Sequence, residues 1–456
     1  MEKKYDAVIL GFGKGGKTLA GYLANQGKSV ALVERSEKMY GGTCINIGCI
    51  PTKSLVDGAH RAVAKELTTF EEKAAHYKAS VAQKEKLVTM LRNKNFHMLA
   101  DRPEITIYHG FGSFVDAYTV QVESEQGKEL LQADQIFINT GASPVILPIE
   151  GVKDNKNVYV SEEILDLTEL PKELVIIGGG YIGLEFAAMY NAYGSHVTVL
   201  QNLPVLVPRE DRDIAAALQQ EMERQGITFV FSANVQRVVD KNGQTYVEYD
   251  VQDQHYSIAA DAVLMATGRK PNTAGLHVEA AGLKLQPNGG IVTDNQRRAS
   301  DHIWVMGDAA GALMFTYVSL DDFRIVRSSL EGGTYTAEGR NIPYSVFIEP
   351  TLSVVGLTEA AAQEQGLDIA VATLPAGAIP KAHVLQHPYG MLKAIVDKKT
   401  SMILGAALFC EDSHELINII KLAMDAHVPY TQLRDQIFTH PTMAEALNDL
   451  FSKISK

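Results

Sequence analysis

The stretch Ala7-Val8-Ile9-Leu10-Gly11-Phe12-Gly13-Lys14-Gly15-Gly16 decides the fold of this chain. Its four apolar residues are typical of a buried strand, and its glycines include the spacing Gly-x-Gly-x-x-Gly. A helix is expected next, over residues 17–26, followed by a second strand over 29–33 that ends at Glu34. In such a unit the glycines permit a tight turn, a close approach to a pyrophosphate, and close packing of helix on strand. The stretch therefore predicts a dinucleotide-binding unit.

The same unit occurs a second time in the sequence. Apolar residues 174–177 lead into Gly178-Gly179-Gly180-Tyr181-Ile182-Gly183, with a helix expected over 184–193 and a strand over 196–200. Gly178 follows Gly11 by 167 residues, and Gln201 follows Glu34 by the same 167 residues. One glycine motif is weak evidence, but two in frames of matching length predict two dinucleotide-binding units.

The two copies differ where the second strand ends. Glu34 can accept both hydroxyls of an adenosine ribose, as FAD or NAD presents them. Gln201 removes the carboxylate that would repel a 2′-phosphate, and Arg209 lies nearby in the sequence. We therefore expect FAD at the first unit and NAD(P)H at the second, with NADPH slightly favoured.

Three further features define the domain organisation. Residues 135–142 and 262–269 are apolar strands that end in Thr140-Gly141 and Thr267-Gly268, and residues 303–308 form a strand that delivers Asp308 to a turn. Residues 53–100 are polar and helix-rich, and from about residue 344 strands (346–349, 392–397 and 403–409) and an amphipathic helix (413–426) are expected. The predicted fold class is α/β, with two interleaved Rossmann-like dinucleotide-binding domains plus a C-terminal α+β dimerisation domain. The expected limits are 1–147 with 272–340 for FAD, 148–271 for NAD(P)H, and 341–456 for the interface.

Composition narrows the class of protein. The 456 residues are 46% hydrophobic and carry a net charge of −12, which argues against nucleic acid or an anionic membrane as partner. No apolar run is long enough to span a bilayer, and the N-terminus leads into a strand, so a cytoplasmic protein is expected. No metal site is expected either, because His383, His387 and His414 are scattered and no Cys/His group has zinc spacing.

The segment Gly41-Gly42-Thr43-Cys44-Ile45-Asn46-Ile47-Gly48-Cys49 follows the first unit and brings two thiols close to the flavin site. Thiols separated by four residues can bridge within about one and a half helical turns, and a helix N-terminus would lower the pKa of a thiolate. A structural disulfide is disfavoured in the cytosol, so the pair is predicted to be redox-active. Lys53 is expected near the isoalloxazine, with Glu185 as its ion partner.

His440 and Glu445 form a second candidate group. A carboxylate five residues after a histidine can hold the imidazole tautomer and raise its basicity, so that the imidazole can exchange protons with a thiol.

Together with both glycine motifs and Met306-Gly307-Asp308, these segments resemble the flavoprotein disulfide reductases over essentially the whole chain. That family includes glutathione reductase, dihydrolipoamide dehydrogenase and mercuric reductase. The resemblance implies a homodimer in which His440 and Glu445 reach the disulfide of the other subunit. It also implies that Cys49 contacts the flavin, that Cys44 is the interchange thiol, that Tyr181 gates the nicotinamide pocket, and that Asp308 binds the ribityl chain.

Residues 90–97, 317–326, 412–419 and 433–438 are more specifically similar to the bacterial RclA-type reactive-chlorine-resistance flavoproteins. The resemblance implies reduction of hypothiocyanous acid in oxidative-stress defence, and copper(II) reduction has also been attributed to that group. Asp321-Asp322-Phe323 departs from glutathione and lipoamide enzymes, which makes those substrates doubtful. The tail, residues 448–456, has no cysteine relay, so a small-molecule oxidant is expected to meet Cys44 directly.

The sequence therefore predicts an NAD(P)H-dependent FAD oxidoreductase that reduces hypothiocyanous acid through a Cys44–Cys49 disulfide. Three alternatives stay open: a copper(II) or metal-ion reductase, a disulfide reductase of the glutathione reductase or dihydrolipoamide dehydrogenase type, and a non-enzymatic flavin redox sensor. The expected catalytic residues are Cys44, Cys49, His440, Glu445, Lys53 and Glu185. The expected FAD-binding residues are Gly11, Gly13, Gly16, Glu34, Gly42, Thr43, Lys53, Thr140, Gly141 and Asp308. The expected NAD(P)H-binding residues are Gly178, Gly180, Tyr181, Ile182, Gly183, Glu185, Gln201 and Gly268.

Overall fold

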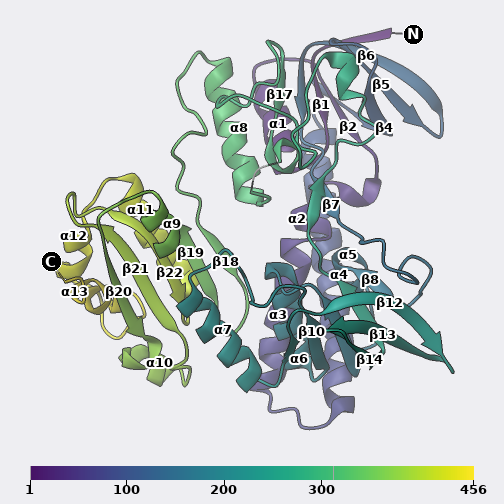
Figure 1. The fold of residues 1–456 in the computed structure, drawn as a ribbon. Coiled ribbons are helices and arrows are strands. Elements are labelled where there is room, and N and C mark those ends of the chain that lie inside the picture. The colour runs from purple at the N-terminus through teal and green to yellow at the C-terminus, as the bar shows by residue number, and fades with distance from the viewer. Residues whose placement is uncertain (1, 312, 456) are drawn as a thin grey trace.

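The computed structural model describes residues 2–311 and 313–455 (Figure 1). Met1 and Lys456, the outer limits of the expected first and last domains, lie outside the described residues. Within the described ranges, none of the helices combines the length and the apolar character that crossing a bilayer requires.

The first glycine motif lies in a sheet of seven strands with the order β3-β2-β1-β6-β5-β4, in which β17 also pairs with β6. Strands β1, β2 and β6 run parallel, and α1 (Lys14–Asn25) follows β1. Strand β17 returns to β6 from beyond the second repeat, so the sheet draws on two separated parts of the chain. The strand bounds are β1 (Glu2–Leu10), β2 (Val30–Glu34), β3 (Ile105–His109), β4 (Phe111–Phe114), β5 (Thr119–Ser124), β6 (Gly127–Ile138) and β17 (Ile303–Val305).

The second glycine motif lies in a five-stranded parallel sheet with the order β11-β10-β9-β15-β8. An antiparallel sheet, β12-β13-β14, and a two-stranded link, β7 with β16, accompany it. The strand bounds are β7 (Ala142–Pro144), β8 (Val158–Val160), β9 (Glu173–Ile177), β10 (His196–Leu200), β11 (Thr228–Val230), β12 (Asn234–Lys241), β13 (Gln244–Val251), β14 (Gln254–Ala260), β15 (Ala262–Met265) and β16 (Arg269–Pro271). The helices of this part are α5 (Ser161–Ile164), α6 (Tyr181–Tyr193) and α7 (Arg212–Arg224).

The C-terminal part is an antiparallel sheet, β18-β19-β22-β21-β20, with its own helices. The predicted strand over 346–349 is wrong: β18 ends at Val346, and Glu349 lies in the turn before Pro350, which has no N–H for a ladder. The bounds are β18 (Tyr344–Val346), β19 (Leu352–Gly356), β20 (Ile369–Pro375), β21 (Met391–Asp397), β22 (Ile403–Phe409), α9 (Glu359–Glu364), α10 (Pro380–Val384), α11 (Ser413–Asp425), α12 (Tyr430–Asp435) and α13 (Ala446–Ser452).

Four helices connect these parts: α2 (Thr43–Asn46), α3 (Cys49–Ala64), α4 (Phe70–Ala100) and α8 (Thr316–Leu330). In Figure 1, α3 and α4 extend from the first sheet down to α6 beside the second sheet. Leu55 of α3, Tyr190 of α6, Ile348 and Phe409 belong to one buried apolar cluster. The apolar core therefore fixes α3 against both the second repeat and the C-terminal sheet.

These topologies confirm the predicted fold class of two interleaved Rossmann-like units and a C-terminal α+β domain. The exact domain limits stay a prediction.

A buried ion-pair network supports the turn that carries Asp308. The Asp322 side chain is 1% exposed and accepts hydrogen bonds from Arg297 (2.8 Å), Arg340 (2.9 Å) and the Gly307 N–H (2.8 Å). Removing one partner from a buried ion pair leaves the other charges desolvated and unpaired.

We expect Asp322→Asn to lower the free energy of unfolding by about 3 kcal/mol, because two arginines lose their buried counter-charge. Urea unfolding at matched flavin content measures this change. Asp321→Asn is the matched control, since that side chain is 19% exposed and its loss should cost less than about 1 kcal/mol. Equal losses in the two variants would contradict the assignment.

Candidate active site

Cys44 and Cys49 lie on two different helices. Cys44 belongs to α2, whereas Cys49 is the first residue of α3, so the expectation that the pair spans one continuous helix is wrong. The chain breaks at Ile47 and Gly48, and a Cβ on Gly48 would lie 3.0 Å from the Thr43 carbonyl oxygen and 3.4 Å from the Cys44 Cα. A side chain at this position would crowd the backbone of Thr43 and Cys44, so glycine favours the close approach that brings Cys44 against the N-terminus of α3.

The two thiols have opposite acidities. A hydrogen bond from Cys44 lowers the pKa of Cys49 to about 6, and the hydroxyl of Thr316 and the charge of Lys53 act in the same direction. The same hydrogen bond, together with burial, raises the pKa of Cys44 well above its ordinary value. Cys49 also lies at the positive end of a helix dipole. At neutral pH the reduced pair is therefore a Cys49 thiolate that accepts a hydrogen bond from the Cys44 thiol.

Lys53 lies one turn after Cys49 on α3. Its Nζ is 2.6 Å from Glu185 Oε2 on α6 and 4.6 Å from the ring centre of Phe347. The other oxygen of Glu185 accepts the Phe347 N–H at 2.8 Å. The sequence pointed to Lys53 and Glu185, and the structure adds Phe347 as the third member.

A cavity of about 1810 Å³ contains both cysteines and extends along the first glycine motif. Of the predicted FAD-binding residues, Gly16 alone is absent from its lining. The others are Gly11, Gly13, Glu34, Gly42, Thr43, Lys53, Thr140, Gly141 and Asp308. Helix α1 begins after Gly13 with no side-chain cap, as a helix that receives a phosphate requires. The carboxylates of Glu34 and Asp308 also line the cavity and can accept hydrogen bonds from hydroxyl groups, so the residues present fit a flavin dinucleotide.

The second unit repeats the first at atomic detail. The Phe12 N–H donates to Glu34 Oε2 at 3.0 Å, and the Gly179 N–H donates to Gln201 Oε1 at 3.1 Å. Gln201 therefore keeps the contact with the glycine loop and loses the negative charge. A Cβ on Gly180 would meet nothing within 4 Å, so this loop is open to a dinucleotide.

Only some of the predicted NAD(P)H-binding residues line the cavity. Tyr181, Ile182 and Glu185 line it, whereas the remaining five lie outside its lining: Gly178, Gly180, Gly183, Gln201 and Gly268.

Tyr181 is held by residues that the sequence did not single out. Its hydroxyl donates to Glu210, and Glu210 also accepts the hydroxyl of Tyr344 at 2.6 Å. The two tyrosine rings lie 5.5 Å apart, and the Tyr344 ring stacks on Phe315. Glu210 and Tyr344 come from different parts of the chain, so only the fold reveals this group.

His440 and Glu445 form the predicted pair, with 2.8 Å between His440 Nδ1 and Glu445 Oε2. Neither residue lines the cavity that holds Cys44 in the described part of the chain. The histidine side chain is 69% exposed, so it is available to a second subunit.

Asn139 is a further residue that sequence reasoning missed. Its Oδ1 accepts the Gly16 N–H at 2.9 Å, and its Nδ2 donates to the Met306 carbonyl at 2.7 Å. Ser319 supports the same loop by accepting the Gly15 N–H at 3.1 Å. The position of Asn139 directly before Thr140-Gly141 was the available signal.

Comparison with known proteins defines the class. Residues 5–322 match the pyridine nucleotide-disulphide oxidoreductase family, and residues 342–451 match its dimerisation domain. The chain belongs to this family of oxidoreductases. It is 49% identical to the probable pyridine nucleotide-disulfide oxidoreductase RclA of Escherichia coli, over 99% of each chain. It is also 32% identical to the dihydrolipoyl dehydrogenase of Mycobacterium tuberculosis, over 98% of this chain and 97% of the relative.

Solved structures give the same result. A Cu(II) complex of the HOCl-induced flavoprotein disulfide reductase RclA from Escherichia coli has a TM-score of 0.92 with this chain and covers 99% of both chains at 49% identity. The predicted RclA-type resemblance, the enzyme class and the use of FAD with NAD(P)H are therefore confirmed.

The acidity of Cys49 can be measured directly. We expect the alkylation rate of Cys49 in the reduced enzyme to rise with pH through about 6, because the thiolate is the nucleophile. Cys44→Ala removes the hydrogen bond that lowers this pKa, so the profile should move to higher pH. Iodoacetamide labelling read by mass spectrometry gives both profiles, with Cys49→Ser as the control for labelling elsewhere. An unchanged profile in Cys44→Ala would disprove the role of that hydrogen bond.

Proposed function

We propose that this chain reduces hypothiocyanous acid with electrons from NAD(P)H, and that Cys44 is the thiol that meets the oxidant. The observation that supports it most is the opposite acidity of the two thiols, with Cys49 ionised and Cys44 protonated beside it. A small electrophile that thiol sulfurs attack suits such a pair. The relative from Escherichia coli is described as HOCl-induced, which favours a role in defence against reactive chlorine.

The thiol chemistry balances as follows. The Cys44 sulfur attacks the sulfur of hypothiocyanous acid, and water leaves with the Cys44 proton, which gives a sulfenyl thiocyanate on Cys44. The Cys49 thiolate then attacks the Cys44 sulfur, which releases thiocyanate and forms the disulfide. When bound, FAD supplies the two-electron transfer by which NAD(P)H reduces this disulfide again.

Residues of the chain itself transfer the protons and position the reacting groups. Because the pKa of Cys44 is raised, its attack needs a base, and we assign this role to His440 of the partner subunit. Glu445 holds the imidazole tautomer through its contact with Nδ1. We assign Lys53 and Glu185 to the charge balance beside Cys49, and Asp308 to the ribityl chain.

Tyr181 is assigned as the gate of the nicotinamide pocket. To move, its hydroxyl must leave Glu210, while Tyr344 keeps that carboxylate in place. We place the whole cycle in the cytoplasm, where thiols are kept reduced.

Cys44→Ser should abolish turnover of hypothiocyanous acid, because no thiol then reaches the oxidant. Reduction of the bound flavin by NAD(P)H should continue in the same variant. Stopped-flow absorbance of the flavin and steady-state NAD(P)H consumption separate the two steps. Turnover that survives in Cys44→Ser would mean that the flavin reacts with the oxidant directly.

The neutral Gln201 leads us to propose a slight preference for NADPH. Gln201→Glu places a carboxylate beside the 2′-phosphate, so we expect kcat/KM for NADPH to fall by roughly tenfold, equivalent to about 1.4 kcal/mol. The value for NADH should change little, and it serves as the internal control. A wild-type enzyme that strongly prefers NADH would contradict the proposal.

Copper(II) reduction is the second candidate, because the relative of known structure is described as a Cu(II) complex. Lipoamide reduction has weaker support, from relatives 32% identical that are named dihydrolipoyl dehydrogenases. Assays with hypothiocyanous acid, Cu(II), lipoamide and glutathione disulfide under one set of conditions rank these substrates.

A further inference from the structure

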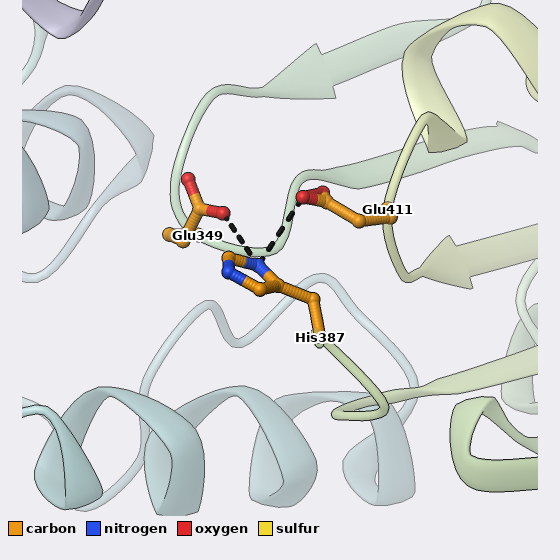
Figure 2. A group of neighbouring side chains, drawn as sticks. All are labelled: Glu349, His387 and Glu411. Atoms are coloured by element: carbon orange, nitrogen blue, oxygen red, sulfur yellow. Dashed lines mark ion pairs between the residues drawn. The ribbon is translucent and has the colours of Figure 1, made fainter. Parts of the chain in front are cut away.

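A group of potential metal ligands lies outside the cavity that holds the cysteines. Glu349 comes from the turn between β18 and β19, His387 from the loop between α10 and β21, and Glu411 follows β22. The donor atoms of the three side chains lie within 4.8 Å of one another. Figure 2 shows both carboxylates pointing toward the same ring nitrogen of His387. Three separate loops of the C-terminal domain therefore converge on one point.

The distances are close to those of a coordination shell. His387 Nδ1 lies 2.9 Å from Glu349 Oε1 and 3.2 Å from Glu411 Oε1. Ligands of a tetrahedral zinc ion are separated by about 3.4 Å, since each bond is about 2.1 Å long. An ion therefore needs only a small outward movement of these side chains.

A histidine of α3 lies beside this group and contacts the carboxylate oxygen of Glu349 that faces away from His387. His60 of α3 has its Nε2 2.7 Å from Glu349 Oε2. The converging group itself has one imidazole and two carboxylates, a mixed nitrogen and oxygen set that suits zinc and its neighbours among the divalent transition metals. The set is also accessible, with the side chains of Glu349, His387 and Glu411 exposed by 30%, 40% and 23%.

The group combines negative charge with converging donor atoms. Glu349 and Glu411 each place a carboxylate oxygen close to one nitrogen, His387 Nδ1. A divalent metal ion would supply positive charge to both carboxylates.

We propose that Glu349, His387 and Glu411 bind one divalent transition-metal ion such as Zn²⁺, and that His60 orients Glu349 through its other carboxylate oxygen. The site joins α3 to the C-terminal domain. His60 lies eleven residues after Cys49, which is about three turns and places both side chains on the same side of the helix. Glu349 is two residues from Phe347, the neighbour of Lys53 and Glu185. A bound ion would therefore fasten the helix that begins at Cys49.

Zinc titration of the flavin-loaded, chelator-treated enzyme tests the proposal. The enzyme is kept oxidised, so that Cys44 and Cys49 are held in their disulfide and do not compete for the metal. We expect calorimetry to show one zinc ion per chain and thermal unfolding to move to higher temperature with zinc. No binding up to about 100 μM zinc would overturn the proposal, and the group would then be a set of ion pairs only.

Variants locate the ion. His387→Asn and Glu411→Gln should each weaken zinc binding by roughly 100-fold or more, and His60→Asn by roughly tenfold. His383→Asn is the matched control, because His383 lies four residues away and its Nε2 contacts the Gly377 carbonyl instead. His60 is exposed on α3, so His60→Asn remains informative if a loop variant fails to fold. Equal affinity in wild type, His387→Asn and His60→Asn would place the metal elsewhere and overturn the proposal.

Discussion

Cys49 is the first residue of a sixteen-residue helix, and the positions of that helix and of Cys49 depend on contacts from every part of the chain. The Tyr193 hydroxyl of α6 donates to the Leu55 carbonyl at 2.9 Å, which fixes α3 against the second repeat. Lys53 joins the helix to Glu185, and His60 joins it to Glu349 of the C-terminal domain. Because the rate of a reaction is sensitive to displacements of about 1 Å, these contacts belong to the candidate active site even where they lie far from sulfur.

The two glycine motifs share a backbone but differ in how they are supported. A Cβ on Gly11 would lie 2.3 Å from the Asn139 carbonyl oxygen, and one on Gly178 would lie 2.5 Å from that of Ala266. The close approach is thus the same, whereas Asn139 adds side-chain bonds to the loop and to Met306 that Ala266 cannot make. Met306 follows β17, the strand that returns from beyond the second repeat. Asn139 therefore joins the first glycine loop to the segment that follows β17. Ala266, at the matching position of the second unit, makes no such side-chain connection.

Local pattern explains what the sequence predicted well. The strands at 196–200 and 403–409 have the expected bounds, because an apolar run between polar or glycine residues can be recognised from the local sequence alone. The strand expected over 262–269 begins at Ala262 as expected but ends earlier, at Met265. The break at Gly48 was missed, since the spacing of the two cysteines also fits one and a half turns of a single helix, and the two helices are seen only in the structure. Glu210 and Tyr344 were missed for a different reason: they are 134 residues apart and meet only after the domains assemble. The contact between Glu349 and His387 was missed for the same reason, because it forms only when separate loops come together in the fold.

The contacts of Asp321 and Asp322 change the interpretation of this pair, which distinguishes the chain from glutathione and lipoamide enzymes. The pair argues against glutathione or lipoamide as the substrate only if the two carboxylates face the substrate. Asp322 instead bonds Arg297, Arg340 and the Gly307 N–H, and Asp321 bonds Arg340 and the Tyr335 hydroxyl. Both carboxylates thus have partners within the chain, and Asp322 acts on the turn of Asp308. Under the proposed function, selection of the small oxidant must then come from the thiols themselves. Burial raises the pKa of Cys410, the third cysteine, and its side chain is 0% exposed, so it is inert. Cys44 and Cys49 are then the only thiols of this chain that can react, and the opposite acidities of the two become the main chemical filter.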